Sequence, residues 1–217
     1  AAVQAYHEWL PTRLPEPANP LRIYRSFDFG TLASIHMLDT RLIGRDKQVT
    51  LDQYLAGEAA GSTRQLLGQP QVDWLSGRMA ASASTWQVLG QQVLMMRMHI
   101  PLSIAANFSL ETLSDYLAAQ ALPDSARSDS QRALLAQEKV PYNLDAWDGY
   151  PAARDAVLAM ARTQGKNLIS LAGDTHNAWA GNLTDLSGQR VGVEFATSSV
   201  SSPGFERALP LIANDLL

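Results

Sequence analysis

An acid and an imidazole stand two residues apart in Gly173-Asp174-Thr175-His176, directly after the short apolar run LISLA. Such a run is typical of a buried strand, and α/β sheets bind ligands beyond the carboxyl ends of their strands. In an extended segment residues i and i+2 point to the same side, so Asp174 and His176 would converge on one ion. A carboxylate with an imidazole suits iron, zinc, manganese or calcium. Both residues are therefore candidate metal ligands, unless Asp174 caps a turn and His176 bonds a carbonyl group.

Asp148, in Trp147-Asp148-Gly149-Tyr150-Pro151, is a second candidate. It precedes a predicted helix that begins at Pro151, where an acid either caps the helix or reaches a metal ion. This local context alone favours the structural interpretation.

Other polar residues give weaker signals. Asp39 and Arg41 close a predicted strand. An arginine there can grip a phosphate with two hydrogen bonds, although a structural Asp–Arg pair is the simpler interpretation. His7, His36 and His99 stand alone on apolar segments, and we expect them to satisfy hydrogen bonds in the core.

The composition limits the possible functions. The chain has 217 residues, a net charge of −4, 46% hydrophobic and 18% charged residues, and no cysteine. These proportions exclude wholesale disorder, and the acidic balance disfavours a nucleic-acid partner. The lack of cysteine excludes disulfides, a thiolate nucleophile and a zinc finger within this chain. No apolar run approaches the roughly 20 residues of a transmembrane helix.

Helical and strand-like patterns alternate, which predicts an α/β fold. We expect strands over residues 22–30, 32–40, 86–96, 167–172 and 191–197. We expect helices over residues 1–10, 70–79 and 151–165, and one short helical turn within 44–68. Residues 101–145 are expected to form a helical excursion, or a lid over a site. The chain begins inside a helical pattern without a signal peptide and ends without a cap, so we expect a piece of a longer protein.

Seven strings in this order resemble the PhoD-type alkaline phosphatases. They are AYHEWLPTR (5–13), IYRSFDFG (23–30), HMLDTR (36–41), GQPQVDWL (68–75), WDGYPAARD (147–155), GDTHNAW (173–179) and FATSSVSSPGF (195–205). The resemblance spans nearly the whole chain and is weakest over residues 104–143. It implies a four-layer α/β/β/α metallophosphoesterase sandwich, apparently incomplete here, in which two central sheets pack between helices. It also implies hydrolysis of phosphomonoesters and phosphodiesters with calcium and iron, in a periplasmic, cell-surface or secreted protein.

The resemblance assigns roles to three residues. The wider superfamily ends a buried strand with the metal motif Gly-His-x-His, and the PhoD-type enzymes have Asp at the first His position. The string at 173–176 occupies this place. This implies that Asp174 is a metal ligand and that His176 is a ligand or the group that protonates the leaving oxygen. Asp148 is a weaker third ligand. A metal-activated hydroxide would attack phosphorus, and no serine nucleophile is needed.

The chain also departs from the family pattern. It lacks the Gly-Ser-Cys string, the early Asp, the metal-bound Tyr region and the Asp-Asp-His-Glu loop. We therefore expect residues 1–217 to be the C-terminal portion of one catalytic domain, without its N-terminal half. The isolated chain would hold a minority of the metal ligands and be inactive. It would also expose a large apolar sheet face and associate with itself or a partner.

Two rival functions stay open. One is a non-catalytic scaffold or binding domain that keeps the phosphatase fold without its metals. The other is a sugar or lipid hydrolase with paired carboxylates. The natural phosphate ester, whether a teichoic acid, a phospholipid, a nucleotide or a small monoester, is not set by these motifs.

Overall fold

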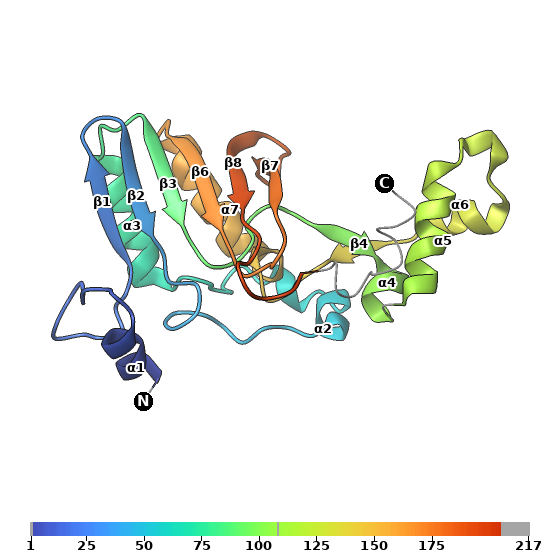
Figure 1. Ribbon diagram of the computed structural model, residues 1–217. Helices are drawn as coiled ribbons and strands as arrows, with labels where there is room; N and C mark the ends of the chain where they lie inside the picture. The colour runs from blue at the N-terminus through green and yellow to red at the C-terminus, as the bar shows by residue number, and fades with distance from the viewer. Residues whose placement is uncertain (1, 108, 205–217) are drawn as a thin grey trace.

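A six-stranded mixed sheet forms the centre of the computed structural model, which describes residues 2–107 and 109–204 (Figure 1). Its strand order is β1-β2-β3-β6-β8-β7. The edge strands β1 and β7 pair antiparallel with their neighbours, and the four inner strands are parallel. The strands are β1 (Arg25–Phe29), β2 (Ala33–Met37), β3 (Trp86–Gly90), β6 (Asn167–Ala172), β7 (Trp179–Thr184) and β8 (Arg190–Ala196). The carboxyl ends of the inner strands therefore meet at one edge, where the predicted site residues follow β6.

Two helices, α3 (Gln69–Ala81) and α7 (Pro151–Thr163), cover one face of this sheet (Figure 1). Each begins with a proline in its first turn, where the missing N–H has no helical partner to lose. Their apolar faces form a core with the inner strands. The fully buried residues of these helices include Leu75, Met79, Leu158 and Ala161. Both helices are confirmed.

Glu194 of β8 fixes the loop that follows β3. Its fully buried carboxylate accepts hydrogen bonds from the N–H groups of Met95 and Met96, at 2.9 and 2.5 Å, and from Ser170 Oγ at 2.9 Å. These backbone groups point at a side chain instead of a neighbouring strand. The strand predicted over 86–96 is therefore too long, and it ends at Gly90.

The opposite face of the sheet is apolar and exposed. Phe27, Met37, Leu171 and Phe195 belong to four different strands, and each exposes more than a third of its surface. Strand β6 is thus buried on one face only, which corrects the prediction of burial on both. Among the described residues, one large sheet and one helical layer account for two of the four expected layers.

Residues 99–141 form a mostly helical arm at the far end of the molecule from β1 (Figure 1). A short antiparallel pair, β4 (His99–Pro101) with β5 (Lys139–Pro141), forms its base. The arm's helices are α4 (Leu102–Ala106), α5 (Leu110–Ala121), η2 (Asp124–Ala126) and α6 (Asp129–Ala136). Side chains of Ser109 and Ser128 cap α5 and α6, as expected for serine at a helix start. The role of this arm as a lid stays a prediction.

The remaining elements are short. They are α1 (Ala2–Trp9), α2 (Leu51–Leu55), η1 (Glu58–Ala60) and η3 (Trp147–Gly149). Helix α1 was predicted. The stretch 44–68 holds two helical turns, α2 and η1, instead of the one predicted. Thr50 and Gln53 form a capping box at the start of α2. In the described part of the chain, every helix is too short or too polar to cross a bilayer.

Candidate active site

The loop after β6 has an unusual backbone. Asp174 and His176 have φ of 60° and 59°, and among the described residues they are the non-glycine positions with positive φ. This left-handed conformation is uncommon for residues with a side chain, and such strain concentrates at functional sites. The loop is not the extended segment that the sequence predicted. Asp174 faces Arg41, and His176 Nδ1 lies 3.1 Å from the carbonyl oxygen of Pro203, so the two side chains have different described partners.

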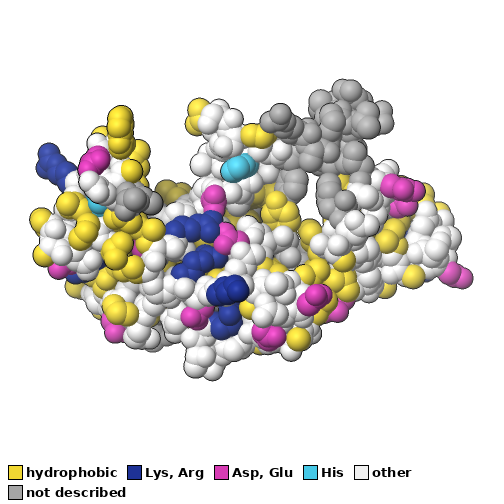
Figure 2. Space-filling view, turned by 90° about the horizontal axis from the view of Figure 1, so that it is seen from below, with side chains coloured by type: hydrophobic (Ala, Val, Ile, Leu, Met, Phe, Trp, Pro, Cys, Tyr) yellow, Lys and Arg dark blue, Asp and Glu magenta, His cyan; other side chains and the backbone are white. Residues whose placement is uncertain are grey.

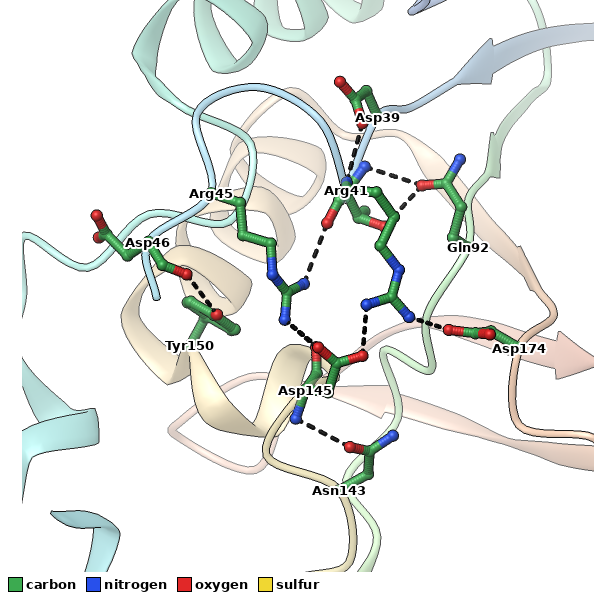
Figure 3. A network of polar contacts seen from close by, with 10 residues as sticks. Asp39, Arg41, Arg45, Asp46, Gln92, Asn143, Asp145, Tyr150 and Asp174 are labelled. Atoms are coloured by element: carbon green, nitrogen blue, oxygen red, sulfur yellow. Dashed lines mark hydrogen bonds and ion pairs between the residues drawn. The ribbon is translucent and has the colours of Figure 1, made fainter. Parts of the chain in front are cut away.

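Arg41 bridges two carboxylates at this edge of the sheet (Figure 3). Its Nη2 pairs with Asp174 Oδ2, and its Nη1 donates to Asp145 Oδ2 at 2.5 Å. Arg45 donates to the other Asp145 oxygen, also at 2.5 Å. Partial burial lowers the pKa of Arg41, but the hydrogen bonds and charges of Asp145 and Asp174 outweigh it and raise that pKa. The guanidinium is therefore a permanent cation held beside Asp174.

Buried side chains set the direction of Arg41. Asp39 is fully buried, and its Oδ1 accepts the N–H groups of Arg41 and Leu42, which closes a tight turn after β2. Gln92, after β3, accepts from Thr40 N–H and Oγ1 and so ties the two strand ends together (Figure 3). The Asp39–Arg41 pair of the sequence is thus a backbone contact, and the guanidinium pairs with other acids.

A second cationic cluster lies beside this network. The guanidinium carbons of Arg45 and Arg64 lie 5.0 and 4.8 Å from the ring centre of Tyr150. The Tyr150 hydroxyl donates to the carbonyl oxygen of Asp46 at 2.8 Å, and burial raises the pKa of this phenol. Cation–π contacts of this kind hold Arg45 in place next to Asp145.

Asp148 lies in a different environment. It is buried in η3, and its Oδ2 accepts the N–H of Met98 at 2.9 Å and lies 3.9 Å from His99 Nε2. Burial raises the pKa of this carboxyl group. Its described contacts lead to the base of the arm and not to Asp174 or His176. Its role as a ligand stays a prediction.

The three predicted ligands are therefore not gathered at one point. Within residues 2–107 and 109–204, no three His, Cys, Asp or Glu side chains are close enough together to hold a metal ion. Of the other histidines, His36 matches its structural prediction: it is fully buried and bonds Ser26 and Gln87.

The sequence did not reveal Asp145. It stands 104 residues from Arg41 in the chain, in no motif of its own, and only the fold brings them together. The one available signal is its position three residues before Asp148, in the string DAWDGY.

Three comparisons agree on the relatives of this chain. The family model of PhoD-like phosphatase matches residues 1–215. The chain is 32% identical to alkaline phosphatase D of Bacillus subtilis (strain 168) over 213 residues, which cover 94% of this chain and 30% of that protein. A solved structure of PhoD is 29% identical, with a TM-score of 0.65, and the match covers 93% of this chain and 34% of that one. The predicted metallophosphoesterase-like α/β fold is confirmed, and the chain spans about a third of the length of these relatives, 30% and 34%.

Proposed function

Because the chain belongs to the PhoD-like phosphatase family, we propose that its parent protein is a metal-dependent hydrolase of phosphoric monoesters and diesters. One observation carries the proposal. A strained loop at the carboxyl end of β6 carries both Asp174, which is paired with the cation of Arg41, and His176, two residues further on. Carboxylate, imidazole and guanidinium are the groups that phosphoryl transfer needs for metal ligation, proton transfer and charge stabilisation.

The donor types of this loop fit the metals that the family resemblance implies. A carboxylate oxygen suits calcium, and both carboxylate and imidazole suit iron. We propose that Asp174 and His176 contribute ligands and keep Asp148 as a third candidate. With so few donors, this chain would supply part of a metal site, and the isolated chain would have no measurable activity. When bound, the metals would polarise phosphoryl oxygens and lower the pKa of a coordinated water.

The residues of this chain then have separate tasks. Arg41 keeps the Asp174 carboxylate in one orientation and adds positive charge where phosphoryl oxygens gather charge. Arg45 and Asp145 hold Arg41 from its other side. The imidazole of His176 protonates the leaving alcohol oxygen, or it binds a metal through Nε2, since Nδ1 faces the carbonyl oxygen of Pro203. We further propose export to the periplasm, cell surface or medium, as the family resemblance implies.

The test uses the parent protein loaded with calcium and iron and a chromogenic phosphate ester. Asp174→Ala is expected to lower kcat by at least about a hundredfold, since an incompletely held metal loses most of its effect. Asp52→Ala, at an exposed position of α2, is the matched control and should leave kcat unchanged. Full activity in Asp174→Ala would contradict the proposal.

A non-catalytic scaffold is the second candidate. The pairing of Asp174 with Arg41 favours it, because a carboxylate neutralised by arginine needs no metal. This candidate predicts that the parent protein neither hydrolyses phosphate esters nor retains calcium or iron.

A further inference from the structure

An apolar cleft lies inside the arm, between the β4–β5 pair and helices α4 and α5. Its volume is about 440 Å³, within the range of small-molecule sites. Hydrophobic and aromatic side chains provide most of its wall, among them Met98, Ile100, Ile104, Leu113, Tyr116 and Leu117. A wall of this composition favours an aliphatic or aromatic group over a sugar or a peptide rich in charge.

The charges at the cleft favour an apolar group that is attached to an anion. Among the described residues that line it there is no carboxylate, and the basic ones are His99 and Lys139. An anionic head group at the mouth would therefore meet the ammonium group of Lys139 and no acid among these lining residues.

A short stretch of chain connects the cleft to the proposed phosphate site. Tyr142 lines the cleft, and Asp145, three residues further on, holds Arg41 beside Asp174. Three residues span at most about 11 Å, and Asn143 shortens the path by accepting the Asp145 N–H at 2.9 Å. Figure 2 shows Lys and Arg side chains gathered near the middle of the face seen from below, with hydrophobic side chains on the side toward the arm.

We propose that this cleft binds the aliphatic alcohol moiety of a phosphate ester whose phosphoryl group lies beside Arg41 and Asp174. The inference rests on the proposed function and adds a substrate class to it: esters of long-chain alcohols, including lipid-like ones. The arm is then a specificity element, because its helices build the wall that an alkyl chain contacts.

The test measures binding to the 217-residue chain, so it does not depend on turnover. Methyl, n-butyl, n-hexyl and n-octyl phosphate are titrated by calorimetry below the concentration at which they form micelles. Each methylene that enters the cleft should tighten binding by about two- to fourfold. Addition of n-octyl phosphate should slow the exchange of backbone amide hydrogens in residues 98–104 and 110–121. This measurement uses the unaltered chain.

Two matched variants separate the cleft from other apolar surfaces. Leu117→Glu places a charge in the cleft wall, at a side chain that is 38% exposed, and should abolish the dependence on chain length. Phe27→Glu places the same charge on the bare sheet face, at a side chain of β1 that is 48% exposed, and should leave that dependence intact. Circular dichroism and thermal unfolding check that both variants fold.

Several outcomes would overturn the inference. Equal affinity for methyl and n-octyl phosphate would exclude the cleft. Loss of chain-length dependence in Phe27→Glu instead of Leu117→Glu would place the alkyl group on the sheet face. Binding that appears only after removal of residues 205–217 would mean that this segment occupies the cleft. Binding that appears only in monomers of a dimeric sample would mean that a second copy of the chain occupies it. Equal affinity for n-octanol and n-octyl phosphate would exclude the link to a phosphate ester. Failure of the parent protein to hydrolyse esters contradicts the proposed function instead, and leaves these binding results unchanged.

Discussion

At the scale of single residues, buried polar side chains fix the strand ends that carry the site. Gln71 of α3 pairs with both the N–H and the carbonyl group of Asp39, and Asp39 in turn sets the direction of Arg41. The sequence indicated Asp174 and His176 from their place after an apolar run. It did not reveal the partner Asp145, because residues 104 positions apart carry no local pattern that links them.

Arg41 is expected to act through geometry as well as charge. Arg41→Lys keeps the cation but cannot bridge Asp145 and Asp174, so we expect kcat of the parent protein to fall by about 10- to 100-fold. The side chains of Arg41, Asp145 and Asp174 are 35%, 28% and 46% exposed. Because solvent screens such ion pairs, the free energy of unfolding should change by less than about 1 kcal/mol. Arg132→Lys, in an exposed pair with Asp129, is the matched control for both measurements. Unchanged kcat in Arg41→Lys would remove Arg41 from the site.

Glu194 gives a pH dependence of known sign. Burial raises its pKa, although the N–H groups of Met96 and Met95 oppose this. The folded state therefore binds this proton more readily than the unfolded state, so the stability contributed by Glu194 is complete below its ordinary pKa and declines as pH rises through the raised value. Glu194→Gln should lower the free energy of unfolding by about 1–3 kcal/mol at pH 7, and the gap from the unaltered chain should widen at pH 5.

Urea unfolding followed by circular dichroism at both pH values measures this difference. Glu111→Gln, at an exposed position of α5, is the control and should show no gap at either pH. A gap that narrows at pH 5 would mean that the folded-state pKa of Glu194 is lowered, against the expected sign.

At the scale of elements, periodic patterns predicted the long helices and most strands of the main sheet. They failed where tertiary contacts decide the outcome. Strand β3 ends early because Glu194 captures the next backbone groups, and β7, which the sequence did not indicate, gains its pairing from β8. The arm's two short strands depend likewise on each other, since three residues form no recognisable pattern.

The turn before α7 offers a sharp test of local packing. A Cβ atom at Gly149 would lie 2.0 Å from the carbonyl oxygen of Leu144, so Gly149→Ala must displace backbone. We expect a loss of about 2–4 kcal/mol in the free energy of unfolding. At Gly77, an exposed position of α3, a Cβ meets nothing within 4 Å. Gly77→Ala should therefore stabilise the chain by up to about 1 kcal/mol, and equal effects of the two changes on urea unfolding would contradict this account.

At the scale of the whole molecule, the apolar sheet face is the dominant unexplained surface. The apolar run of β6 predicted burial on both faces, whereas the described helices cover only one face of the sheet and leave the other exposed (Figure 1). Large exposed apolar patches usually mark a surface that another element or protein covers. This accords with the expectation of a second sheet, which the family resemblance, and not the local pattern, supplied.

We expect the isolated chain to self-associate through this face. Replacing Phe27 and Phe195, which are 48% and 51% exposed, by lysine should shift its sedimentation toward a monomer. Leu186→Lys, at a 63% exposed position after β7, is the control and should leave the association unchanged. A monomeric unaltered chain, or an equal response to the control, would show that the face does not drive association.

The central claim is that the loop after β6 belongs to the metal site of a phosphoesterase. Its most direct test is the metal content of the parent protein, measured by elemental analysis after equilibration with calcium and iron. We predict that the unaltered protein retains metal, that Asp174→Ala loses part of it, and that Asp52→Ala retains it in full. Equal metal content in Asp174→Ala and the unaltered protein would contradict the account.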